Sequence, residues 1–145
     1  MVKKALLVLF AVILFLPAMQ SVAAAGEPRG QVLTPPPGSA ERKLILDALR
    51  AEMEKLHHIN AVFVVKYLKV QGGWAWIETL PKSADGANQY EDVSALLRKS
   101  GPKWKVAEIA CAEEDNDECL GSPGYFKRLK KRFPGMPAAI LPEQQ

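Results

Sequence analysis

Apolar residues recur every three or four positions between residues 40 and 56, which is the period of an amphipathic α-helix. The recurring residues are Ile45, Leu49, Met53 and Leu56. Ser39 directly precedes this stretch, and its hydroxyl is suited to accept a hydrogen bond from a backbone N–H of the first turn. We therefore predict a helix over residues 40–56 that begins after Ser39.

Residues 62–70 are rich in β-branched and aromatic residues, which is typical of a strand. Three further strands are predicted over residues 74–80, 92–99 and 104–111. Gln71-Gly72-Gly73 supplies a turn between the first two strands, because glycine readily adopts positive φ. Strands joined by short turns favour an antiparallel sheet, and we expect the first helix to cover one of its faces.

A second, shorter helix is expected over residues 123–132. Ser122 is a candidate N-cap, and Pro123 suits the first helical position because its missing N–H is not needed there. Tyr125, Leu129 and Phe133 lie on one face of this helix. The predicted fold is therefore α+β, with an N-terminal helix packed on a four-stranded antiparallel sheet, followed by a short C-terminal helix.

The first 25 residues have the pattern of a secretory signal peptide. Lys3 and Lys4 precede an apolar run that ends at Pro17, and Ala23-Ala24-Ala25 forms a small-residue cleavage site. The apolar run has about thirteen residues, whereas a helix that spans a bilayer needs roughly 20. We therefore expect a cleaved leader without a membrane anchor, and a periplasmic or secreted protein.

Removal of residues 1–25 leaves about 120 residues, enough for one domain with its own core. Residues 26–38 form a proline-rich arm, which is expected either to be mobile or to lie along the surface, and residues 39–145 form a single domain with an extended tail. The full chain carries 19 Lys and Arg against 16 Asp and Glu, a formal net charge of +3. Two of these cations lie in the leader, so the mature chain is close to neutral and a nucleic-acid partner is not supported.

Cys111 and Cys119 are the only cysteines. In an oxidising compartment we expect them to form a disulfide, the alternative being two buried free thiols. The residues between them include five carboxylates, and oxygen-rich loops suit calcium. Counted from Asp115, however, Leu120 stands where an EF-hand loop requires glycine. A solvated acidic loop closed by the disulfide is the simpler interpretation, and no metal site is predicted.

The C-terminal helix is strongly basic, and its cations are Lys127, Arg128, Lys130, Lys131 and Arg132. A cationic helix can bind an anionic membrane surface, a polyanion or an acidic protein. The alternative is that these cations neutralise the carboxylates of the neighbouring cysteine loop.

Trp74 and Trp76 share one face of their strand because side chains alternate along a strand. They belong to the core, or, if their face is not the one under the helix, they form an exposed aromatic surface for a partner. Glu78 lies on the same face, and Asp92 and Glu108 lie in other strands. A buried carboxylate can act as a general base. No histidine or second acid is placed to complete such a site, so no catalytic residue or cofactor is predicted.

Four segments share an outline with a known group of proteins: Arg42 to Arg50, Ala61 to Val65, Gly73 to Trp76, and Trp104 to Val106. In these segments the chain resembles small, uncharacterised exported proteins of Gram-negative bacteria, with an R-x-x-I-L-D-A-L-R-type helix, a V-x-F-V-V strand, a G-x-W-A-x hairpin and a W-x-V strand. The layout is similar to that of cystatin-like and nuclear-transport-factor-2-like folds, whose members range from inhibitors to isomerases. The resemblance implies no particular activity.

From these patterns we expect a non-enzymatic module that binds another protein of the cell envelope, through the hairpin of Trp74 and Trp76 or through the cysteine loop and the basic helix. The alternative is a small enzyme or small-molecule binder with a cavity between the helix and the sheet.

Overall fold

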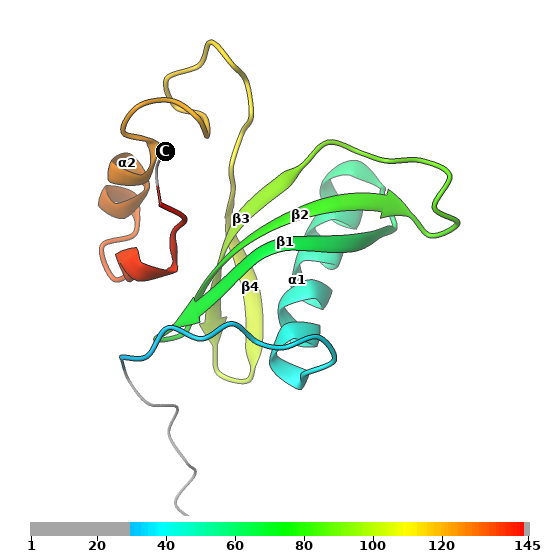
Figure 1. Ribbon diagram of the computed structural model, residues 1–145, viewed down its shortest axis with the longest axis horizontal. Helices are drawn as coiled ribbons and strands as arrows, with labels where there is room; N and C mark the ends of the chain where they lie inside the picture. Colours follow the sequence, from blue (N-terminus) through cyan, green and yellow to red (C-terminus); the bar gives the residue numbers. More distant parts are fainter. Residues whose placement is uncertain (1–29, 144–145) are drawn as a thin grey trace, which may run out of the picture.

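The computed structural model describes residues 30–143 (Figure 1). In chain order the elements are α1 (Ala40–His57), β1 (Ala61–Gln71), β2 (Trp74–Ser83), β3 (Val93–Ser100), β4 (Lys103–Ile109), α2 (Tyr125–Arg132) and the 3₁₀ helix η1 (Ala138–Ile140). The predicted α+β order is confirmed. The expected signal peptide, residues 1–25, lies outside the described residues. Within residues 30–143, no helix is long and apolar enough to cross a membrane.

Helix α1 begins after Ser39, as predicted, and extends one residue beyond the predicted end, to His57. The Ser39 side chain accepts a hydrogen bond from the Arg42 N–H at 3.3 Å, so the predicted N-cap is confirmed. The apolar stripe is buried at Ile45, Leu49 and Met53. The helix ends at His58, which adopts a left-handed conformation and donates its N–H to the Glu54 carbonyl.

The four strands form one antiparallel sheet in the order β1-β2-β3-β4. Gly72 and Gly73 make the turn between β1 and β2 with φ of 58° and 78°, values that favour glycine. A register shift between Val65 and Tyr67 places a bulge in β1.

One face of the sheet packs against α1 and forms the first core. Its most deeply buried residues are Ile45, Leu49, Ala75, Ile77, Ala95 and Leu97. The expectation that the first helix covers one face of the sheet is therefore confirmed.

The opposite face is covered by the C-terminal residues 120–143, which we call the C-terminal cover. In Figure 1, α1 lies on one side of the sheet and the C-terminal cover, coloured orange to red, lies on the other. Its buried residues pack with three residues of the sheet in a second core: Trp74, Trp76, Leu96, Tyr125, Leu129, Met136 and Ile140. The expected extended tail is therefore wrong in part, since η1 lies against β1 and β2 and buries Ile140.

This second core decides between the two interpretations of the tryptophans. Trp74 and Trp76 do lie on the face away from α1, yet both are buried, Trp76 completely. Trp76 meets Phe126 edge to face at a centroid distance of 5.4 Å, and Trp74 meets Phe133 at 5.8 Å. An exposed aromatic surface at these two positions is therefore excluded in this structure, because the C-terminal cover occupies it.

The disulfide between Cys111 and Cys119 is confirmed, with an S–S distance of 2.06 Å. The predicted start of the following helix is wrong, because Gly124, with φ of 82°, is the N-cap of α2 in place of Ser122. The Ser122 hydroxyl instead bonds to the carbonyls of Asp117 and Cys119, at 2.6 and 2.7 Å. Ser122 therefore stabilises the cysteine loop and does not cap the helix.

The described part of the proline-rich arm lies along the surface and is fixed at both ends. Leu33 and Val70 exchange two backbone hydrogen bonds of 2.8 Å, so the arm adds one antiparallel pair to the outer edge of β1. Arg42 also donates to the Pro35 carbonyl at 3.1 Å.

Candidate interaction surface

The C-terminal cover reaches only part of its face of the sheet. Residues 74, 76, 78, 80 and 82 of β2 point to this face, because side chains alternate along a strand. Trp74 and Trp76 are buried, but beyond Glu78 the cover ends. The next two pairs on this face are Val64 with Leu80 and Val62 with Lys82.

Two neighbouring valines are consequently left exposed on β1. Val62 is 52% exposed and Val64 is 46% exposed, and Leu80 beside them is half-buried. We call these three residues the uncovered patch. Single exposed apolar residues are ordinary, whereas a contiguous exposed apolar patch is a feature of many protein interaction sites.

The outer edge of β1 has free hydrogen-bonding groups next to this patch. The Pro81 carbonyl accepts from Tyr90, on the side of β2 away from β1, so the backbone groups of Phe63, its partner in register, point away from β2. At one end of this edge Arg50 donates to the Ala61 carbonyl at 3.2 Å, and at the other Leu33 pairs with Val70. Between these contacts, no described residue bonds to the outer edge.

A cleft of about 500 Å³ lies where the C-terminal cover ends. Glu78 lines it from the sheet, Phe126 and Pro142 line it from the cover, and a smaller cavity of about 210 Å³ adjoins it at Glu78 and Leu120. The Glu78 carboxylate is half-buried and accepts a hydrogen bond from Trp76 Nε1 at 3.1 Å. Within residues 30–143, no cation lies within ion-pair distance of it.

The charge of Glu78 affects Tyr67, which is opposite it in register. Burial raises the pKa of the Tyr67 hydroxyl, and the nearby carboxylates of Glu78 and Glu143 raise it further. The neighbouring cation Lys66 pairs with Asp92 at 2.6 Å. Among the described residues the Glu78 carboxylate thus has no ion-pair partner, while Arg128 donates to two other residues of the cleft wall, the Pro123 carbonyl at 3.1 Å and the Ser122 hydroxyl at 2.7 Å.

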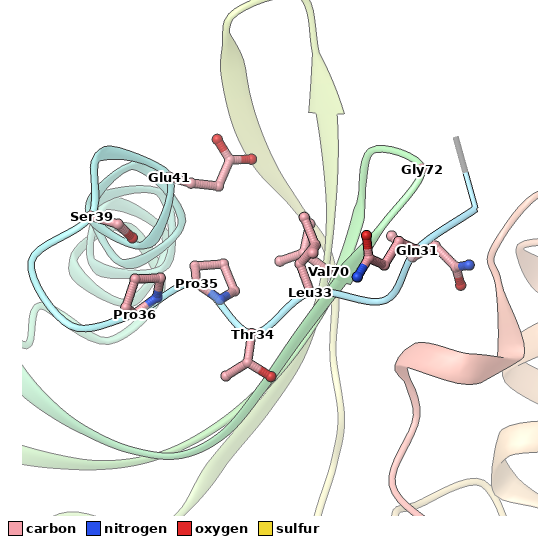
Figure 2. A pocket seen from close by; sticks show the side chains of 10 residues that line it. Gln31, Leu33, Thr34, Pro35, Pro36, Ser39, Glu41, Val70 and Gly72 are labelled. Carbon is pink, nitrogen blue, oxygen red and sulfur yellow. The ribbon is translucent and has the colours of Figure 1, made fainter. Parts of the chain in front are cut away.

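A separate apolar cleft of about 290 Å³ lies between the arm, the start of α1 and the end of β1. Figure 2 shows Leu33 beside Val70, the two prolines that lead from there to Ser39, and the Glu41 side chain pointing across the cleft. The Glu41 carboxylate accepts from Trp104 Nε1 at 3.0 Å and from Lys99 Nζ at 3.1 Å. Its charge thus serves to join α1 to the β3–β4 hairpin.

The basic residues of α2 divide into two groups. Arg132 donates two hydrogen bonds to Glu108, of 3.0 and 2.6 Å, and Arg128 lies 3.6 Å from Glu118. The contacts of Arg128 and Arg132 with Glu118 of the cysteine loop, the latter at 3.9 Å, are those that one interpretation expected, whereas Glu108 belongs to β4. Lys127, Lys130 and Lys131 are exposed, and in the described chain no carboxylate lies within ion-pair distance of them.

Glu108 is the centre of the contact between α2 and β4. The Tyr125 hydroxyl donates to the Glu108 carboxylate at 2.9 Å. Burial, followed by this hydrogen bond, raises the pKa of Tyr125, and Glu108 raises the pKa of Arg132. The candidate base Glu108 is therefore fully engaged in holding the C-terminal cover on the sheet.

The other candidates for chemistry are dispersed. Asp92 is exposed in its ion pair with Lys66. In the cysteine loop, Glu113 accepts from Asn116 Nδ2 at 2.9 Å, and Glu118 faces Arg128. Among the described residues, no three His, Cys, Asp or Glu side chains come together in a way that could hold a metal ion.

The sequence did not reveal the uncovered patch. Residues 62–65 are apolar at every position, a pattern typical of a strand buried on both faces. The signal in the sequence was a difference in length. The predicted C-terminal helix is too short to cover the whole length of the predicted first strand, so part of that sheet face is left exposed.

No family model, curated protein or solved structure matches this chain in the comparisons made with each.

Proposed function

We propose that this chain is an exported, non-enzymatic module that binds another protein along the outer edge of β1 and the uncovered patch. The observation that carries the proposal is the exposure of Val62 and Val64 beside a strand edge whose hydrogen-bonding groups no described residue uses between Ala61 and Val70. Export is supported by the signal-peptide pattern and by the disulfide, which suits an oxidising compartment.

The occupant that fits this surface is an extended segment of the partner. The arm already adds one antiparallel pair to the same edge at Leu33 and Val70, so the edge accepts extended chain. An incoming strand would pair with residues 61–65, on the other side of the bulge from Leu33, where main-chain bonds supply affinity and side-chain contacts supply specificity. Exposed edges are usually protected by bulges and lysines. The bulge and Lys66 protect the middle of β1, whereas residues 62–65 carry no such device.

A second candidate function is small-molecule binding in a depression of about 790 Å³ beside the end of α1. His57, Tyr90 and Asp92 line it. The Asp92 side chain is 60% exposed and paired with Lys66, so this depression lacks the desolvated carboxylate that a general base requires. The residues therefore favour protein binding.

Site-specific photo-cross-linking in the bacterial envelope tests the proposal. A photoreactive residue at position 64 should yield a discrete adduct, and one at position 44, where Leu44 is 42% exposed on α1, should not. Val62→Lys should abolish the adduct, and Leu56→Lys, at a control position that is 51% exposed, should leave it unchanged.

The cross-linked protein is then identified, purified and titrated against the full chain. Burying a valine contributes about 1.5 kcal/mol, which corresponds to about tenfold in affinity. The variant Val62→Lys/Val64→Lys should therefore bind at least about tenfold more weakly. Equal affinity of this variant and of the control Leu44→Lys/Leu56→Lys would contradict the proposed surface.

A further inference from the structure

We infer that the cleft at Glu78 receives a lysine or arginine side chain of the segment that docks on β1. This inference rests on the proposed function, because the docked segment is what brings the cation to the cleft. It assigns the chemistry of the partner: apolar residues facing the uncovered patch and one basic residue on the same face.

The position of Glu78 relative to the patch supports this assignment. Tyr67 on β1 pairs with Glu78, and the next described pair on the same face is Val64 with Leu80. Glu78, the one sheet residue that lines the cleft, therefore lies on the same face as the uncovered patch, two residues from Leu80 along β2. A segment docked beside residues 61–65 lies next to the patch, and its continuation past the bulge lies beside Tyr67, the residue opposite Glu78.

Distance selects the kind of side chain that can reach the carboxylate. Glu78 lies on β2, so it is separated from an added strand by two strand spacings, which is about 10 Å. Only the long side chains of lysine and arginine span most of that distance. The cleft of about 500 Å³ has room for such a chain, and its wall includes Phe126, Pro123 and Pro142, against which an aliphatic stem can pack.

The negative charge of Glu78 favours a cationic side chain of the partner. Glu78 is half-buried, and its described hydrogen bond comes from the neutral indole of Trp76. Lys66, the cation that lines the adjoining cavity, is engaged with Asp92 at 2.6 Å. Glu143 adds a second negative charge near Tyr67, where both carboxylates raise the tyrosine pKa. An incoming ammonium or guanidinium group meets a carboxylate without a cationic partner among the described residues.

Synthetic peptides and the full mature chain test the inference. The first probe is a blocked peptide of alternating valine and threonine with one central arginine, and the second carries uncharged citrulline in place of that arginine. By isothermal titration at low salt, the wild-type chain should bind the arginine peptide about tenfold more tightly. This preference should shrink as salt is added, because salt screens the ion pair.

Glu78→Gln is the decisive variant. The glutamine amide oxygen can still accept from Trp76 Nε1, so the fold should be retained, as circular dichroism and chemical denaturation will verify. Glu78→Gln should bind both peptides equally. The control Glu54→Gln removes an exposed carboxylate of α1 and should keep the full arginine preference.

The outcomes separate this inference from the proposed function. If the wild-type chain binds both peptides equally and Val64→Lys weakens both, the docking edge stands and the cation site is wrong. If Glu78→Gln keeps the arginine preference, the cation site is also wrong. If neither peptide binds the wild-type chain, docking along β1 itself is refuted.

Discussion

The hydrogen bond between Tyr125 and Glu108 should determine how firmly the C-terminal cover is held, and Tyr125→Phe removes only that bond. Tyr125 is 1% exposed, and its hydroxyl donates to the carboxylate at 2.9 Å. A hydrogen bond to a charged group contributes about 1.5–3 kcal/mol. Glu108 keeps both bonds from Arg132 in the variant, so we expect the lower end, about 1.5 kcal/mol less stability at neutral pH.

The same substitution should change how the free energy of unfolding depends on pH in the alkaline range. The pKa of Tyr125 is raised above its ordinary value of 10.0 in the folded protein, chiefly by burial. Above about pH 10 the tyrosine ionises in the unfolded chain while the folded chain keeps its proton, so the free energy of unfolding falls as pH rises. Tyr125→Phe should reduce this decline. Part of it should remain, because the pKa of Tyr67 is also raised.

The measurement is urea denaturation of the wild-type chain and Tyr125→Phe at pH 7 and between pH 9 and 11. Tyr90→Phe is the matched control, since the Tyr90 hydroxyl forms no hydrogen bond with the described residues. A loss below about 0.5 kcal/mol at pH 7, the range of neutral surface substitutions, together with an unchanged alkaline decline would refute the role of this bond.

Two further predictions concern the covalent form of the chain. Replacing Cys111 and Cys119 by serine should lower the free energy of unfolding by about 2.5 kcal/mol on the chain-entropy model, since the disulfide closes a loop with a sequence separation of 8. Denaturation of the oxidised wild-type chain and the double variant measures this, and equal midpoints would contradict it. N-terminal sequencing of the protein isolated from its native compartment should begin near Gly26, and a start at Met1 would overturn the expected export.

Local pattern was sufficient for α1 and the sheet. Short stretches of sequence predict the helical spacing of Ile45, Leu49 and Met53 and the cap at Ser39. The folded structure keeps both features. The same holds for the hairpin at Gly72 and Gly73, where the turn needs positive φ.

The C-terminal cover could not be predicted in this way. Met136 stands between Gly135 and Pro137, and Ile140 belongs to a short apolar run that ends at Pro142, so neither shows a helical or strand period that indicates burial. Their burial depends on Trp74 and Trp76, which lie 60 or more residues earlier in the chain. Val64 is exposed because the C-terminal cover ends before it. The sequence around Val64 does not indicate where the cover ends.

The order in which the two cores are completed has a consequence for biosynthesis. A chain is made from its N-terminus, so α1 and all four strands are available before residues 120–143 emerge. During that interval the indoles of Trp74 and Trp76 have no protein to pack against on their side of the sheet. A nascent or prematurely terminated chain would therefore expose this apolar surface to chaperones and proteases. The exposure ends only when residues 120–143 pack onto the sheet.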